Sequence, residues 1–169
     1  MAIYLKKSPL LRIVGHQLEK FEHKIFYNRP AVFLDRCGTE HVSNLTHRPK
    51  FNHTTTLYLR NSDPLVMEQL VRKCVFPDLE RAYVSSFPYS SRFFGLYFPH
   101  VNFYIAEPFY SHGLDKFWSH RHTNIHRLME SDFNEILENA VQAGVEEMDG
   151  KSIQPVDLTL PTTFYTDLN

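Results

Sequence analysis

The chain has 169 residues, of which 43% are hydrophobic and 22% are charged, and its net charge is −1. These values are typical of a single globular domain and exclude a wholly disordered chain. Because no basic excess is present to neutralise phosphates, a general nucleic-acid binder is not expected. The aromatic share of 14% favours a partner surface, since aromatic side chains are enriched in interfaces as well as in cores.

Targeting and redox features are sparse. Cys37 and Cys74 are the only cysteines, so no disulfide framework is predicted. No apolar run reaches the roughly 18 residues of a membrane-spanning helix, and the N-terminal stretch lacks the apolar region of a signal peptide. We therefore expect no membrane association, and a location in the cytoplasm or within an assembled particle.

The N-terminal half alternates helical and extended patterns. Ser8-Pro9 followed by apolar residues at helical spacing predicts a helix over 9–27, although Gly15 interrupts the pattern. A short apolar strand is expected over 31–35, followed by a long polar loop. The threonine- and leucine-rich stretch 54–60 predicts another strand. Asp63-Pro64 then begins a second predicted helix.

The C-terminal half is richer in aromatic residues. A strand is expected over 82–87, and the runs 92–98 and 101–107 predict a β-hairpin. Apolar residues then recur at helical spacing from about residue 111 to residue 148, with Ser131-Asp132 as a candidate break. No internal repeat is recognised. These elements predict an α+β fold, in which a mostly antiparallel sheet of about four strands is packed by three or four helices.

Two parts of the chain are distinguished by composition. Residues 1–150 are predicted to form one α+β domain, and residues 151–169 an extended tail. The tail has no periodicity and is too apolar for a freely disordered end. We expect it to lie over this domain or to add to a neighbouring chain as a strand or groove filler.

Three residues near the middle of the predicted long helix suggest a metal site. His122 and His126 are four residues apart, so on a helix both imidazoles would face one side, and Glu130 would extend the row. Such a set could hold zinc or another first-row divalent metal, as in a metal-dependent hydrolase or a metal-binding module. A second set of metal-capable residues spans the polar loop: Cys37, His41, His47 and His53.

A second chemical hypothesis concerns two histidines beside predicted strands. Alternate side chains of a strand share a face, so His53 would point with Thr55, and His100 with Asn102. Facing each other, such pairs could supply an acid, a base and phosphate-binding groups to a phosphodiester. The stretch Asn-His-Thr-Thr-Thr-Leu-Tyr-Leu resembles one motif of the two-histidine phosphoesterase superfamily, whereas the second motif carries Asn102 in place of a hydroxyl residue.

The function that we expect is non-enzymatic. No glycine-rich phosphate loop, nucleophile elbow or redox cysteine pair occurs, and the aromatic excess and apolar tail favour an interaction or assembly protein. A subunit of a larger particle, such as a phage virion, is one form of this hypothesis. Its partners would be other protein chains, bound through residues 151–169 and an aromatic surface, and it would need no cofactor.

Overall fold

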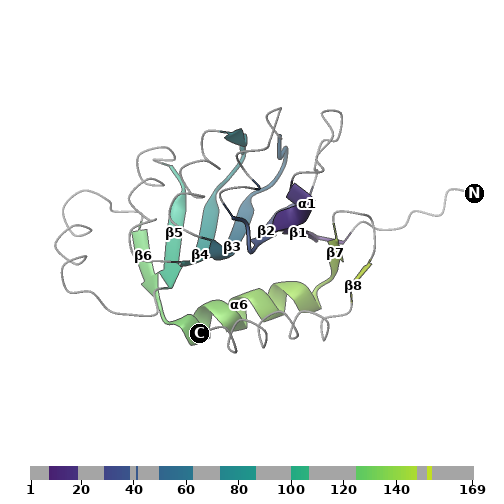
Figure 1. The fold of residues 1–169 in the computed structure, drawn as a ribbon. Helices are drawn as coiled ribbons and strands as arrows, with labels where there is room; N and C mark the ends of the chain where they lie inside the picture. Colours follow the sequence, from purple (N-terminus) through teal and green to yellow (C-terminus); the bar gives the residue numbers. More distant parts are fainter. Residues whose placement is uncertain are drawn as a thin grey trace, which may run out of the picture.

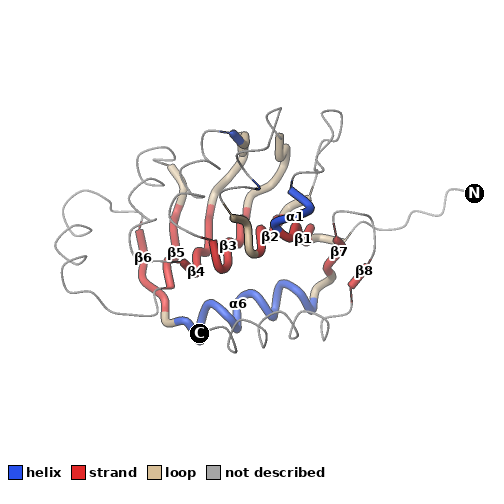
Figure 2. Tube along the Cα trace, in the orientation of Figure 1, coloured by secondary structure: helices blue, strands red, loops and turns tan. Residues whose placement is uncertain are grey.

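The computed structural model describes residues 8–18, 29–38, 41, 50–62, 73–86, 100–106, 125–147 and 152–153. Within these ranges a single sheet forms one layer, and helix α6 (Glu130–Gln142) lies along one of its faces (Figures 1 and 2). A second, short helix, α1, covers Gly15–Leu18. The strands are β1 Leu10–Val14, β2 Ala31–Asp35, β3 Thr56–Ser62, β4 Arg81–Ser86, β5 Asn102–Ala106, β6 Ile125–Leu128, β7 Val145–Glu147 and β8 Ser152–Ile153.

The order of the strands overturns the predicted α+β fold with a mostly antiparallel sheet. The order is β6-β5-β4-β3-β2-β1-β7-β8, and every neighbouring pair from β6 to β7 is parallel. Only β8 is antiparallel to its neighbour β7. The predicted number of about four strands is also wrong, since the sheet has eight. Parallel strands buried on both faces lack the alternation that marks an antiparallel sheet.

The first six strands also form a repeat, so the prediction that the chain has no internal repeat is wrong. Each strand lies beside the strand before it, and residues paired in register recur along the chain at intervals of 21 to 25 residues. One such row joins Leu10, Ala31, Thr56, Arg81 and Asn102. The chain therefore builds its sheet from one strand per unit of about this length, which is the organisation of a repeat protein.

The repeat extends into the turns that precede the strands. Lys50 and Val75 form a parallel bridge, and the rings of Phe51 and Phe76 stack with centroids 4.7 Å apart. These two phenylalanines stand at equivalent positions before β3 and β4. Equivalent residues of neighbouring units thus lie side by side outside the sheet as well as within it.

The predicted helix over 9–27 is wrong for Leu10–Val14, which form β1, whereas Gly15–Leu18 are helical as α1 and residues 19–27 lie outside the described residues. Leu10, Leu11 and Ile13 lie in β1 and are almost completely buried. Leu10 faces α6, whereas Leu11 and Ile13 belong to the core on the opposite face. A strand covered on both faces is a continuous apolar run, and such a run also matches a helical stripe by chance.

Of the other predicted elements in this part of the chain, the strands are observed but the hairpin is not. The strand over 31–35 is confirmed as β2, and those over 54–60 and 82–87 overlap β3 and β4. The hairpin is wrong, because β5 pairs in parallel with both β4 and β6. Residues 92–98, the other half of that hairpin, lie outside the described residues, as does most of the second predicted helix.

The long helical region predicted from residue 111 is divided in the structure. Residues 125–128 form strand β6, and the helix begins only at Glu130. Phe133, Leu137 and Val141 are its buried residues, and they pack on the sheet between β6 and β7. Figure 1 shows α6 lying beneath the sheet, from β6 at one edge to β7 beyond β1.

The two faces of the sheet have separate cores. The face away from α6 is apolar and includes Val32, Leu34, Leu59, Val84 and Phe103. The start of the predicted tail, Ser152–Ile153, is strand β8, while residues 154–169 lie outside the described residues. Among the described helices, none is long and apolar enough to cross a membrane.

Candidate functional site

The face of the sheet that carries α6 displays side chains in rows, because paired residues of parallel strands point the same way. The central row starts at Arg12 in β1 and ends at the edge strand β6. Its members, in order across the sheet, are Arg12, Phe33, Tyr58, Tyr83, Tyr104 and His126. Five of these six positions hold a ring.

Four of the rings form a continuous stack, which we call the aromatic ladder: Tyr58, Tyr83, Tyr104 and His126. The centroids of successive rings are 5.3, 4.8 and 4.9 Å apart, and neighbouring planes differ by 13–20°. These separations match the spacing of about 4.8 Å between strands, so the sheet itself sets the stacking distance. Each stacked pair adds to the stability of the sheet, since aromatic pairs gain energy beyond their buried area.

The side chains of this row are more exposed near β6 than near β1. Phe33 is fully buried and Tyr58 is 7% exposed, whereas Tyr83 and Tyr104 are partly exposed and His126 is exposed. The neighbouring row towards the starts of the strands changes in the same direction. There, Leu10 is buried, while Arg81 and Asn102 are exposed. One corner of the face therefore stays accessible, and we call it the exposed corner: Arg81, Tyr83, Asn102, Tyr104 and His126.

The path of α6 explains why this corner is left uncovered. The helix leaves the end of β6 after Leu128 and delivers the chain to Val145, which pairs with Leu10 at the start of β1. The helix must therefore cross the face diagonally, from the carboxyl end of the edge strand β6 to the amino end of β1. A diagonal helix covers the middle of the face and leaves the corner at the starts of β4–β6 exposed, whereas Asp35 and Arg60 at the opposite corner, at the ends of β2 and β3, are buried.

Backbone hydrogen bonds between the units fix the start of each strand, and so the register of the exposed corner. The amide of Arg81 donates to the carbonyl of Thr55, and the amide of Asn102 donates to the carbonyl of Glu80. The guanidinium of Arg81 donates to the hydroxyl of Thr56 over 3.0 Å and pairs with Glu80 at 3.2 Å. The corner is thus built on rigid strand ends.

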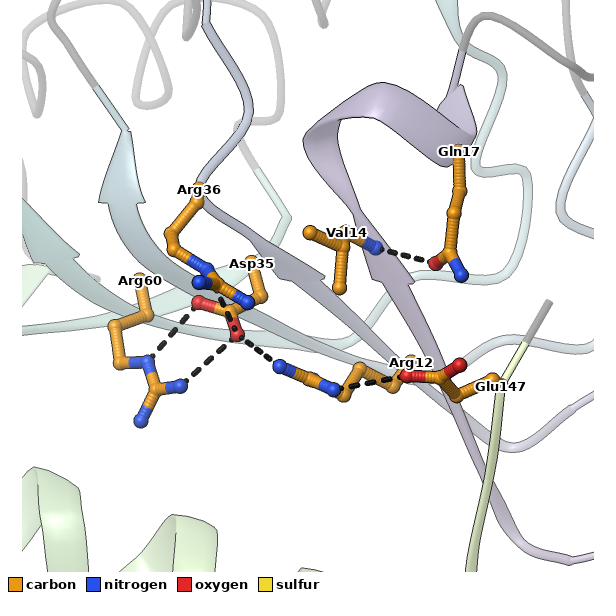
Figure 3. A network of polar contacts seen from close by, with 7 residues as sticks. All are labelled: Arg12, Val14, Gln17, Asp35, Arg36, Arg60 and Glu147. Carbon is orange, nitrogen blue, oxygen red and sulfur yellow. Dashed lines mark hydrogen bonds and ion pairs between the residues drawn. The ribbon is translucent and has the colours of Figure 1, made fainter. Parts of the chain in front are cut away.

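The opposite corner holds a cluster of charged side chains (Figure 3). Asp35 is fully buried and accepts hydrogen bonds from both Arg12 and Arg60, with N–O distances of 2.9–3.1 Å. Arg12 also pairs with Glu147 of β7 at 3.0 Å, and Arg36 lies 3.6 Å from Asp35. The cluster joins β1, β2, β3 and β7, so it fastens the returning C-terminal strand to the repeat strands.

The electrostatics of this cluster agree with a structural role. Burial lowers the pKa of Arg36, and the charges of Arg12 and Arg60 act in the same direction, while Asp35 opposes them. The guanidinium of Arg60 also lies over the ring of Phe33, 5.0 Å from its centroid. Arg36 adopts a positive φ of 58°, which marks the sharp end of β2. We therefore assign the charged cluster a structural role: it holds together the strands that form this face of the sheet.

The residues of the predicted metal site do not lie in a row on one helix, as the prediction required. His126 lies in β6 and Glu130 begins α6, so the two are not on one helix. His126 instead ends the aromatic ladder. His122 lies outside the described residues, and among those described no three histidine, cysteine or acidic side chains gather as a metal site would require. The metal hypothesis itself stays a prediction.

The residues of the phosphoesterase hypothesis are not arranged as facing strand pairs. His53 is an exposed turn residue with a positive φ of 65°, and its amide donates to Asp78. The hydroxyl of Thr55 donates to the carbonyl of Pro30, which lies at the entry to β2. His100 is exposed in the turn before β5, whose first residue is Asn102.

Strand β4 separates the two halves of that hypothetical site. Since β3 and β5 are both neighbours of β4, their backbones are roughly 9–10 Å apart. Both histidines lie at the same end of the sheet, but they are in the turns that precede two parallel strands of one layer. Of the four residues, only Asn102 lies in the exposed corner.

The loop residues considered as a second metal set have other contacts. Cys37 is buried, and burial together with the charge of Asp35 raises the pKa of its thiol. The imidazole of His41 accepts a hydrogen bond from the amide of Gly38. His53 is exposed beside Asp78, and His47 lies outside the described residues.

The aromatic ladder was missed although the sequence carries a signal for it. An apolar-aromatic-apolar triplet recurs at the centre of four successive strands: Val32-Phe33-Leu34, Leu57-Tyr58-Leu59, Ala82-Tyr83-Val84 and Phe103-Tyr104-Ile105. Aligning these triplets would have predicted both the repeat and the stack of rings.

Comparisons with known proteins add no further indication. No protein-family model, curated protein or solved structure matches this chain. The proposals below therefore depend on the geometry of the described residues alone.

Proposed function

We propose that this protein is a non-enzymatic interaction module that binds a segment of another protein chain at the exposed corner. The observation that carries this proposal is the aromatic ladder, in which Tyr58 is buried, Tyr83 and Tyr104 are partly exposed and His126 is exposed. Tyrosine is enriched at protein interfaces because it combines a large apolar ring with a polar hydroxyl group.

The architecture supports the same function. One strand per 21–25 residues is similar to the organisation of leucine-rich repeats, whose strands carry the pattern Leu-x-Leu-x-x-Asn/Cys. Val32-Phe33-Leu34-Asp35-Arg36-Cys37 matches that pattern except that Val32 replaces the first leucine. Repeat proteins of this kind use the extended surface formed by equivalent positions of successive units to bind partners.

The chemistry of the exposed corner favours binding over catalysis. It presents rings, one amide and one guanidinium that is already paired with Glu80. Among the described residues no acid, base and nucleophile lie together there in the way that a catalytic site requires. Binding through residues 151–169, and membership of a larger particle such as a virion, remain additional predictions of the same hypothesis.

Selection from a random peptide library tests the proposal. Peptides would be selected against the full chain and then measured against Tyr104→Ala and His126→Ala. Met129→Ala is the matched control, because Met129 is a large, 58% exposed side chain outside the corner. We expect both ladder variants to weaken the selected peptides about tenfold or more, corresponding to the loss of a central anchor, while the control binds like the wild type.

Two results would contradict this proposal. One is a library that yields no peptide binding to the wild-type chain. The other is a set of peptides that bind all three variants equally well. Circular dichroism of each variant would establish that the sheet is intact, so that a loss of binding reflects the missing ring.

A further inference from the structure

We propose that the partner segment binds at the edge of β6 as a further parallel strand, with an aromatic side chain stacked on His126 and an acidic residue opposite Arg127. This inference rests on the proposed function and specifies the form and the chemistry of the segment. It combines the position of β6 in the sheet, the end of the aromatic ladder and the register of Arg127.

Strand β6 is the outermost strand on its side of the sheet (Figure 1). Within the described part of the chain it pairs with β5 and with no second strand. Alternate residues of an edge strand direct their backbone N–H and C=O groups away from the sheet, where another extended chain can pair with them in series. The form of backbone that fits this edge is therefore a strand.

The aromatic ladder ends at the same edge. One face of the His126 ring stacks on Tyr104 with centroids 4.9 Å apart, and His126 is exposed. Among the described residues no ring lies on its other face. A strand added to β6 would place its side chains about 4.8 Å further along the row. An aromatic residue opposite His126 would therefore continue the ladder with the spacing of its existing steps.

The opposite face of β6 departs from the pattern of the other strands. One row in register contains aliphatic side chains from β1 to β5 and a half-buried arginine in β6: Ile13, Leu34, Leu59, Val84, Ile105 and Arg127. A charged side chain on the inner face of an edge strand disfavours pairing with another apolar strand, because the added strand would remove water from the guanidinium group. An acidic residue opposite Arg127 would replace that water with a carboxylate and form a favourable cross-strand pair. The edge thus selects a segment of complementary charge.

Parallel addition determines the order of the two residues in the partner. His126 and Arg127 follow each other along β6, and in a parallel pair the residues opposite them follow each other in the same direction. The aromatic residue must therefore come directly before the acidic one. In an antiparallel segment this order would be reversed.

A labelled peptide tests the proposal by fluorescence anisotropy with the full chain. It contains Asn-Phe-Tyr-Glu-Ala, which is the sequence of β5 with glutamate in place of Ile105, and two threonines on either side. Strand β5 is the template because it pairs in parallel with β6, with Tyr104 opposite His126 and Ile105 opposite Arg127. We expect this peptide to bind at least about fivefold more tightly than the control peptide with Asn-Phe-Glu-Tyr-Ala, which has the same composition.

Two changes to the assay examine the backbone pairing and the charged pair separately. N-methylation of the peptide at single positions should weaken binding about tenfold at alternate residues only, since alternate N–H groups of the added strand face β6. Arg127→Glu should weaken binding of the peptide with glutamate, whereas a peptide with lysine in place of that glutamate should bind this variant more tightly than it binds the wild type. A purely structural role of Arg127 would change the affinity of both peptides alike.

Three results would overturn this inference: equal binding of the two peptide orders, N-methyl effects without alternation, or no preference of the lysine peptide for folded Arg127→Glu. The N-methyl series uses the wild-type chain, so it decides the question even if Arg127→Glu does not fold. In each case, library peptides that depend on Tyr104 and His126 would leave the proposed function intact. If neither the labelled peptide nor the library peptides lose affinity with Tyr104→Ala and His126→Ala, both proposals fail.

Discussion

Arg12 and Asp35 meet through a hydrogen bond of 2.9 Å across neighbouring strands, and the carboxylate of Asp35 is completely shielded from solvent. The same carboxylate accepts hydrogen bonds from Arg60. A buried acid that neutralises two or more guanidinium groups is expected to be indispensable, because removing it leaves buried positive charges without compensation.

We therefore expect Asp35→Asn to reduce the free energy of unfolding by about 3–5 kcal/mol. Urea denaturation at neutral pH would measure the change. Glu135→Gln is the control, since that acid is exposed and its loss should change stability by less than about 0.5 kcal/mol. If Asp35→Asn lowered the free energy of unfolding by less than about 1 kcal/mol, the charged cluster would not be important for holding these strands together.

A second prediction concerns Gly15, where β1 ends and α1 begins. A Cβ atom at this position would lie 2.7 Å from Nδ1 of His41 and even closer to the carbonyl oxygen of Arg36. Because one of these atoms belongs to the backbone, Gly15→Ala should lower the free energy of unfolding by about 1–3 kcal/mol. Thermal unfolding would detect the loss. Had Gly15 been the interior of a helix, as predicted from the sequence, alanine would have been stabilising, so the sign of the effect distinguishes the two structures.

The aromatic ladder predicts a difference between two substitutions of Tyr83. Tyr83→Phe keeps both ring stacks and should leave stability nearly unchanged. Tyr83→Leu removes the contacts with Tyr58 and Tyr104, and should cost about 1–3 kcal/mol, since each aromatic pair contributes about 0.5–1.5 kcal/mol. Chemical denaturation of the two variants side by side would measure this difference. Equal stabilities would mean that the rings are adjacent without stabilising the sheet.

Stability should also fall at alkaline pH. Burial raises the pKa of Tyr58 and of Tyr83, and in each case a neighbouring tyrosine of the ladder contributes in the same direction. The folded state therefore keeps these protons at a pH where the unfolded chain releases them. The resulting stabilisation is complete below the ordinary tyrosine pKa of about 10 and is lost as the pH rises through the higher folded values.

The measurement is urea unfolding near pH 8 and above about pH 10. The double variant Tyr58→Phe, Tyr83→Phe should lose less stability between these two conditions than the wild type does. An unchanged pH dependence would contradict the assignment of the effect to the ladder.

A fifth prediction concerns the thiol of Cys37. This thiol is 1% exposed, and burial raises its pKa, so both access and ionisation are suppressed. A thiol reagent such as dithionitrobenzoate should react with it at neutral pH only after denaturation. The variant Cys74→Ala isolates the Cys37 signal, because no other cysteine is present. Rapid modification of the native variant would show that this part of the core opens readily.

The sequence by itself determined which segments are extended, but it did not determine which strands pair with one another. The strand over 31–35 was predicted with its observed bounds, and those over 54–60 and 82–87 nearly so, because β-branched and aromatic residues are concentrated there. The aromatic excess favours a partner surface, and this interpretation stays a prediction. Each of these conclusions depends on composition within a few neighbouring residues.

Only the tertiary structure decided the direction of pairing, the path of α6 and the surroundings of His126. The sequence pattern predicts a helix for Leu10–Val14 because burial on both faces of a parallel sheet produces a nearly continuous apolar run, interrupted here by Arg12, with no period of two. The metal hypothesis placed His126 on a helix, four residues after His122, whereas the structure places it in the short strand β6 directly before α6. The aromatic ladder arises from rings 21 to 25 residues apart that are stacked by strand pairing, and this contact exists only once the sheet has formed.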